Sequence, residues 1–76
     1  MQNTYQVVMF ELGDKGAQEI SQQFVTHKKF VLLKSDITKR IQLGEAKYSI
    51  TERRKFSQVS ALFGNREIIV LDLIKL

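Results

Sequence analysis

The sequence predicts a small α+β domain, in which a small antiparallel or mixed sheet carries one main helix on one face. Two apolar segments, 4–12 and 67–74, have the composition of strands, and segment 49–63 repeats its apolar residues at helical spacing. The chain has 76 residues, which is enough for one domain, 1–76, and too few for a second core.

The first half of the chain predicts a β-hairpin. Segment 4–12 has apolar residues at both odd and even positions, as in a central strand or one covered by a second subunit. Gly13-Asp14-Lys15-Gly16 is typical of a hairpin turn, and 17–25 returns as a polar strand suited to a sheet edge. Residues 30–33 form a short apolar run that predicts a further strand.

Segment 37–50 is compatible with two structures. Ile37, Ile41 and Leu43 fit a short helix that ends at Gly44. They fit equally a strand that turns at Gly44 and returns, and the β-branched residues favour this second interpretation.

The main helix is predicted over about 49–63. Ser49 and Glu52 have the spacing of a capping box, in which each side chain bonds to a free backbone amide at the start of a helix. Gly64 would end the helix in a left-handed cap. The apolar residues expected to pack on the sheet are Phe56, Val59, Leu62 and Phe63.

The last strand, 67–74, is almost continuously apolar, so we expect it in the middle of the sheet beside the first strand. Asp72 interrupts it and is expected either as an outward-facing edge charge or as the partner of Lys75 or of a basic residue from the middle of the chain. With the helix on one face, nothing obvious covers the other. We therefore predict a homodimer through that face, formed by Val8, Phe10, Ile68 and Val70 or by the residues that alternate with them.

Composition makes self-association the expected source of extra stability. A chain of this length buries only about 60% of its unfolded surface. The sequence has no cysteine and one histidine, so neither a disulfide nor a zinc site is expected.

Basic residues are concentrated in the middle of the chain. Residues 28–55 hold nine basic and three acidic groups, a net of +6, whereas the two flanks together have a net of −2. This pattern favours either a phosphate-bearing partner or a solvated face that keeps the protein soluble. On the predicted helix, basic and amide side chains would face away from the core and could contact phosphates and base edges. The expected nucleic-acid-binding residues are Lys39, Arg40, Lys47, Arg53, Arg54, Lys55 and Gln58.

No catalytic residue, metal, cofactor or small-molecule substrate is expected. His27 lacks the companions of a catalytic group, the acidic residues are scattered, and Gly13-x-x-Gly16 is not a phosphate-binding loop. No apolar run approaches the ~20 residues of a membrane span. The N-terminus lacks the basic region of a signal peptide, so we expect a cytoplasmic protein.

Two stretches carry a resemblance to a known family. Leu62-Phe63-Gly64-Asn65 and the strand that follows resemble the end of the helix and the last strand of the small phage-encoded uracil-DNA glycosylase inhibitors. Tyr5-x-Val7-x-Met9 and the Asp14-x-Gly16 turn are also similar. The resemblance implies a dimeric hairpin–helix–strand scaffold that blocks a host enzyme at its DNA-binding surface.

The chain also departs from that family. It is basic where a DNA mimic must be acidic, and it has Ser60 and Phe63 where the family has an acidic residue and a tyrosine on its helix. We therefore expect a non-catalytic regulator of phage or plasmid type that binds DNA or RNA. The alternative is an inhibitor of a host enzyme that acts through a dimeric sheet scaffold.

Overall fold

The structure is a computed structural model, and it describes residues 3–62 and 64–76. These residues form mainly strands: 71% of them are strand and 11% are helix, so the prediction of an α+β fold with a main packed helix is wrong. In chain order the described elements are β1 (Asn3–Gly13), β2 (Gly16–Val25), α1 (His27–Lys34), β3 (Arg40–Leu43), β4 (Ala46–Ser60) and β5 (Gly64–Lys75).

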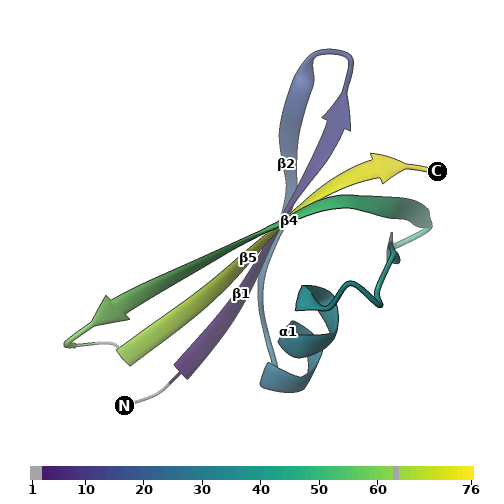
Figure 1. Cartoon of the computed structure of the whole chain (residues 1–76). Helices are drawn as coiled ribbons and strands as arrows, with labels where there is room; N and C mark the ends of the chain where they lie inside the picture. Colours follow the sequence, from purple (N-terminus) through teal and green to yellow (C-terminus); the bar gives the residue numbers. More distant parts are fainter. Residues whose placement is uncertain (1–2, 63) are drawn as a thin grey trace.

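The strands form one mixed sheet in the order β2-β1-β5-β4-β3 (Figure 1). β1 and β5 are parallel neighbours at its centre, and the other pairs are antiparallel. The predicted hairpin, the polar edge strand 17–25 and the position of the last strand beside the first are therefore confirmed.

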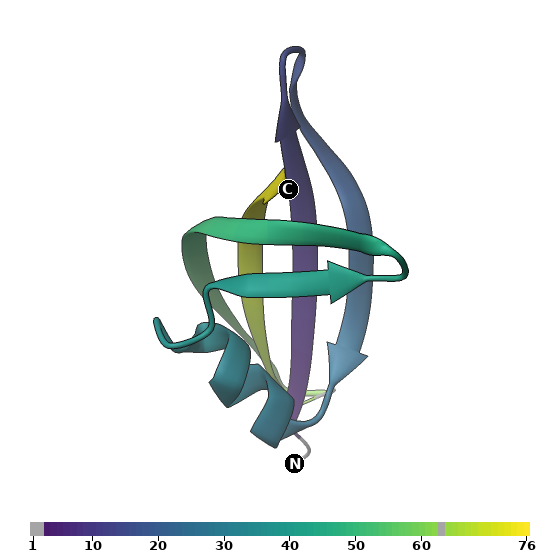
Figure 2. The ribbon, with the colours of Figure 1, turned by 90° about the vertical axis from the view of Figure 1, so that its right-hand side faces the viewer.

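The sheet curls into a half-barrel at β4. A bulge between Ile50 and Glu52 interrupts the pairing of β4 with β5 and bends the strand. The first part of β4 pairs with β3, and Figure 2 shows this hairpin crossing in front of β1 and β5, on the same side of the sheet as α1. Segment 37–50 is thus a linker followed by a hairpin, which is the second of its two interpretations.

The core lies between the sheet and these two covering elements. We call the covered side the inner face; its fully buried side chains come from alternate positions of β1 and β5. Phe30 and Leu33 of α1 pack against them, as do Tyr48 and Ile50 of β4. The fully buried side chains are Val7, Met9, Ile69, Leu71 and Leu73.

Segment 49–63 is not a helix because its backbone pairs with two neighbouring strands. The predicted cap residue Ser49 lies between Arg40 of β3 and Ile74 of β5. Phe56, Val59 and Leu62 have the spacing of a helical stripe, yet their side chains are 51%, 81% and 87% exposed and pack no core. Phe63, the fourth member of that stripe, lies outside the described residues.

The observed helix occurs where the sequence predicted a strand at 30–33. Thr26 caps α1, because its hydroxyl accepts a hydrogen bond from the amide of Lys29 at 3.2 Å. Phe30 and Leu33, three residues apart, then lie on the buried side of the helix. A single turn of apolar residues fits either structure, and the cap and the contact with β1 select the helix.

Candidate nucleic-acid interface

The net charge of the protein lies on one side of the fold. Residues 27–50 hold six basic and two acidic groups, a net of +4, and the rest of the chain holds six of each. These residues are α1, the linker after it, β3 and the start of β4. Figure 2 shows α1 and the β3–β4 hairpin on the same side of the sheet, and we call the surface of residues 27–50 the basic side.

The cations of the basic side are accessible. Five of the six are exposed, and the sixth, Lys34, is half-buried. None belongs to either ion pair found among residues 3–62 and 64–76. The six are Lys28, Lys29, Lys34, Lys39, Arg40 and Lys47.

The β3–β4 hairpin aims its polar residues away from the core. Arg40 lies opposite Ser49, and Gln42 lies opposite Lys47. The intervening pair, Ile41 and Tyr48, packs inward. The amide of Leu76 donates to the carbonyl of Lys47 at 2.8 Å, so the C-terminus is joined to this hairpin.

Arg53, one of the predicted binding residues, has a structural role. Its side chain is only 11% exposed. Its Nε donates to the carbonyl of Leu33 at 2.8 Å, and its guanidinium also donates to the carbonyl of Thr38. One guanidinium nitrogen lies 3.8 Å from the carboxylate of Asp36. Arg53 thus ties the end of α1 and the linker to β4 and is not free to contact a ligand.

Arg54 points to the opposite face of the sheet. Its guanidinium lies 3.0 Å from the carboxylate of Asp72. The Asp72 side chain is 10% exposed and that of Arg54 is 47% exposed. The expected pairing of Asp72 with a basic residue of the middle segment is confirmed, on a central strand rather than at an edge.

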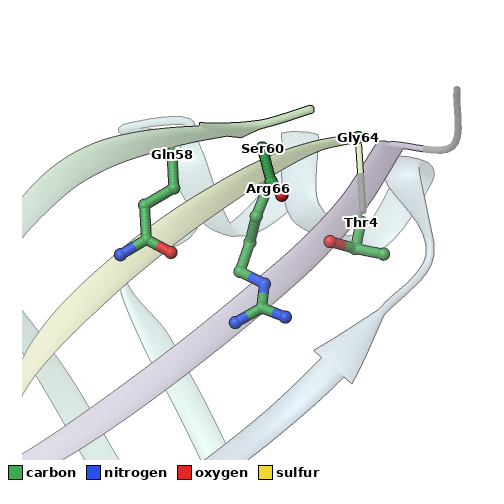
Figure 3. A pocket seen from close by; sticks show the side chains of 5 residues that line it. All are labelled: Thr4, Gln58, Ser60, Gly64 and Arg66. Atoms are coloured by element: carbon green, nitrogen blue, oxygen red, sulfur yellow. The ribbon is translucent and has the colours of Figure 1, made fainter. Parts of the chain in front are cut away.

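The remaining two predicted residues lie on opposite faces of β4. Lys55 is exposed and lies opposite Ile69, on the inner side of the strand. Gln58 lies on the other face, in a shallow depression that it shares with Thr4, Ser60, Gly64 and Arg66 (Figure 3). Of the seven predicted residues, Lys39, Arg40 and Lys47 lie on the basic side, and the other four do not.

The four predicted dimer residues share one face of the sheet. Val8 pairs directly with Val70, and Phe10 and Ile68 alternate with them on the same side. All four are half-buried, and no described element covers them. We call this surface the outer face. The outer face also contains Phe24, which is 61% exposed. Phe24 was not among the predicted dimer residues, although the alternation of residues 17–25 places it on this face.

Arg66 is the other outer-face residue that sequence reasoning missed. Figure 3 shows its side chain extending from β5 across β1. Its guanidinium carbon lies 5.3 Å from the centroid of the Phe24 ring on β2, a cation–π distance. No sequence motif signals this contact, because it depends on the parallel register of β1 and β5.

The described residues hold no group of three or more histidine, cysteine or acidic side chains placed to bind a metal ion. His27 begins α1 and its ring lies 4.9 Å from that of Tyr5.

Burial raises the pKa of Tyr48, and a hydrogen bond to Glu11 and the charge of that carboxylate raise it further. Tyr48 belongs to the core, so this shift concerns stability.

Comparison with known proteins finds no match among family models, curated proteins or solved structures. The resemblance to the uracil-DNA glycosylase inhibitors stays a prediction. Leu62, which it placed at the end of a helix, follows strand β4. In the described part of the chain, no helix is long and apolar enough to cross a membrane.

Proposed function

We propose that this is a non-catalytic nucleic-acid-binding protein that contacts phosphates through its basic side. The observation that carries the proposal is the placement of the whole net charge of +4 on residues 27–50. Six cations there have no carboxylate partner among the described residues. Phosphate groups would supply the missing counter-charge, and binding would release condensed counterions from the nucleic acid.

The uneven distribution of charge supports binding over plain solubility. Charge that only maintains solubility works best with both signs interspersed over the surface. Here the sheet outside residues 27–50 has balanced charge, and the excess lies on two covering elements that are adjacent in space. Such a one-sided field attracts a polyanion and orients the protein on it.

The chemistry of these residues predicts weak sequence preference. Five of the six cations are lysines, which contact phosphate as point charges rather than as bidentate readers of guanine. Arg53 and Arg54, the side chains best suited to base readout, are held by protein partners. We therefore propose contact with the backbone of DNA or RNA, largely independent of sequence.

The test is fluorescence anisotropy with labelled single-stranded and double-stranded oligonucleotides, between about 50 and about 200 mM salt. Lys39→Glu/Arg40→Glu reverses two cations on the basic side. Lys15→Glu/Arg66→Glu is the matched control, because both cations are exposed and lie outside residues 27–50 and away from the β3–β4 hairpin, and the two reversals change the net charge equally. We expect the first variant to lose at least about tenfold in affinity at the lower salt concentration and the control to lose far less.

Equal losses in the two variants would show that net charge alone matters and would contradict a defined basic surface. Absence of binding by the wild type at the lower salt concentration would contradict nucleic-acid binding altogether. No described contact favours a host enzyme as target, so the inhibitor alternative stays a prediction.

A further inference from the structure

The outer face carries a row of apolar side chains among its polar ones, and no second layer covers it. Its central strands present Val8 and Val70 side by side. Phe24 and Phe56 lie on the two flanking strands and are 61% and 51% exposed, and Ile74 of β5 is 46% exposed. A sheet with one apolar face stays stable by packing that face on another layer, and the helix and hairpin occupy the inner face only.

The chain exposes more surface than a compact monomer of its mass, and the excess has the size of one side of a protein interface. Its accessible surface is 5620 Å². A compact monomer of 8.8 kDa would expose about 4800 Å². The excess, about 800 Å², equals the share that one partner buries in a standard protein interface. The radius of gyration, 13.1 Å, also exceeds the roughly 11 Å of a compact domain of this length.

The two cations beside the apolar row of the outer face already have contacts within the chain. Arg54 pairs with Asp72, and Arg66 lies over the ring of Phe24. Glu19 and Glu52 are the exposed acidic groups that flank this row, opposite Phe10 and Asp72. A nucleic acid stacked on the two rings would lack free cations for its phosphates and would meet these carboxylates, whereas a second copy could pack on the apolar row with the carboxylates at its margin.

We propose that the outer face binds a second copy of this chain, so that two sheets pack face to face as a sandwich. Such sheets lie about 10 Å apart and interdigitate their side chains. The interface is isologous, with the same residues contributed by each copy. Because the basic side lies across the sheet from the outer face (Figure 2), the proposed dimer would carry its two basic sides on opposite ends.

The test measures the mass of the protein in solution by sedimentation and by light scattering, from low micromolar to high micromolar concentration. We expect twice the 8.8 kDa of one chain at high concentration. Phe24→Glu and Phe56→Glu remove exposed side chains, so each variant should fold as a monomer. Each should raise the dissociation constant at least about 30-fold, as the loss of an interface hot spot does.

Val59→Glu is the matched control. Val59 is on the same strand as Phe56, three positions away on the opposite face, and is 81% exposed. We expect this variant to dimerise like the wild type. Circular dichroism of all three variants establishes that each is folded.

The absence of cysteine allows a second readout. Gln22→Cys places a thiol on the outer face beside Val8, and Lys55→Cys places one on the other side of the sheet. Thiol labelling of the first should slow as concentration rises, and labelling of the second should not. A monomeric mass at every concentration, or equal loss of dimer in all three glutamate variants, overturns the proposal. The proposal is also overturned if the protein is monomeric and Phe24→Glu lowers its affinity for nucleic acid, because the outer face would then bind nucleic acid.

Discussion

The two sides of this sheet differ in how their charges are used. On the basic side, five cations are exposed and Lys34 is half-buried, and none of the six has a carboxylate partner among the described residues. On the outer face, the cation of Arg54 is neutralised by Asp72 and the cation of Arg66 lies on an aromatic ring. The first surface is suited to a polyanion, and the second to a neutral, apolar partner. A small sheet can therefore carry two separate binding surfaces if its charges are sorted between them.

Arg53 and Arg54 show this sorting at neighbouring positions. Successive side chains of a strand point to opposite faces, so one arginine enters the inner side and the other lies on the outer face. Arg53 bonds to backbone carbonyls at the end of α1, whereas Arg54 bonds to a carboxylate. The two should differ in what they contribute to stability.

The largest expected effect is that of Arg53→Leu. The substitution leaves the carbonyls of Leu33 and Thr38 without this donor and frees the end of α1 from β4. Each uncompensated buried group costs about 1–3 kcal/mol, so we expect a loss of about 2–4 kcal/mol in the free energy of unfolding, measured with urea. Lys55→Leu, at an exposed position of the same strand, is the control and should change stability by less than about 0.5 kcal/mol. Equal effects would contradict the structural role of Arg53.

A smaller loss is expected for Arg54→Met. The variant leaves the carboxylate of Asp72, 10% exposed, without its partner. Because Arg54 itself is half exposed and its attraction is screened by solvent, we expect about 1–2 kcal/mol. Asp72→Leu in the Arg54→Met background should recover part of that loss, since no unpaired carboxylate remains. A double-mutant cycle measures the coupling, and strict additivity would show that the pair contributes nothing.

The hairpin of the basic side depends on one glycine conformation. Gly44, in the turn between β3 and β4, has φ of +60°, which a side chain strains. Gly44→Ala should lower the free energy of unfolding by about 1 kcal/mol, measured by thermal denaturation. Gly13→Ala, in the turn between β1 and β2, is the control, because Gly13 has no positive φ and a Cβ there meets no atom within 4 Å. A larger loss at Gly13 would contradict the described turns.

The smallest effect concerns alkaline pH. The pKa of Tyr48 is raised by burial and then by Glu11, so the folded protein keeps the phenolic proton where the unfolded chain loses it. Its contribution to stability is present below the ordinary tyrosine pKa of about 10 and is lost as pH rises through the higher folded value. The measurement is the free energy of unfolding of the wild type and of Tyr48→Phe, taken at increasing pH from about pH 8. Above about pH 10 the wild type should lose stability relative to Tyr48→Phe. A difference that does not change with pH would show that Tyr48 ionises equally in both states.

The elements that could be predicted from the sequence are those in which a local pattern and the tertiary environment agree. The long apolar strand β5 and the turn at Gly13–Gly16 are examples. β4 could not be recognised because the bulge after Ile50 breaks its two-residue alternation, and Phe56 and Val59 then fall at helical spacing by coincidence. α1 is short, and its identity depends on a cap at Thr26 and on contacts with β1.

The candidate sites were predictable in part for the same reason. Strand alternation was enough to place Val8, Phe10, Ile68 and Val70 on one face. The concentration of basic residues was visible in the sequence, but which cations are free depends on long-range partners. Arg53 reaches the end of a helix that precedes it by 20 residues, and no local pattern shows that contact.

The central claim is that the excess positive charge lies on one side only, and salt dependence tests it most directly. Nucleic-acid affinity and dimer affinity are measured on the same protein between about 50 and about 200 mM salt. If all six cations contact phosphate, the logarithm of nucleic-acid affinity should fall against the logarithm of salt concentration with a slope of about −4 for single strands and about −5.4 for double-stranded DNA. The dimer dissociation constant should stay nearly constant. Nucleic-acid binding that is insensitive to salt, or a dimer that salt dissociates equally steeply, would contradict the separation of the two surfaces.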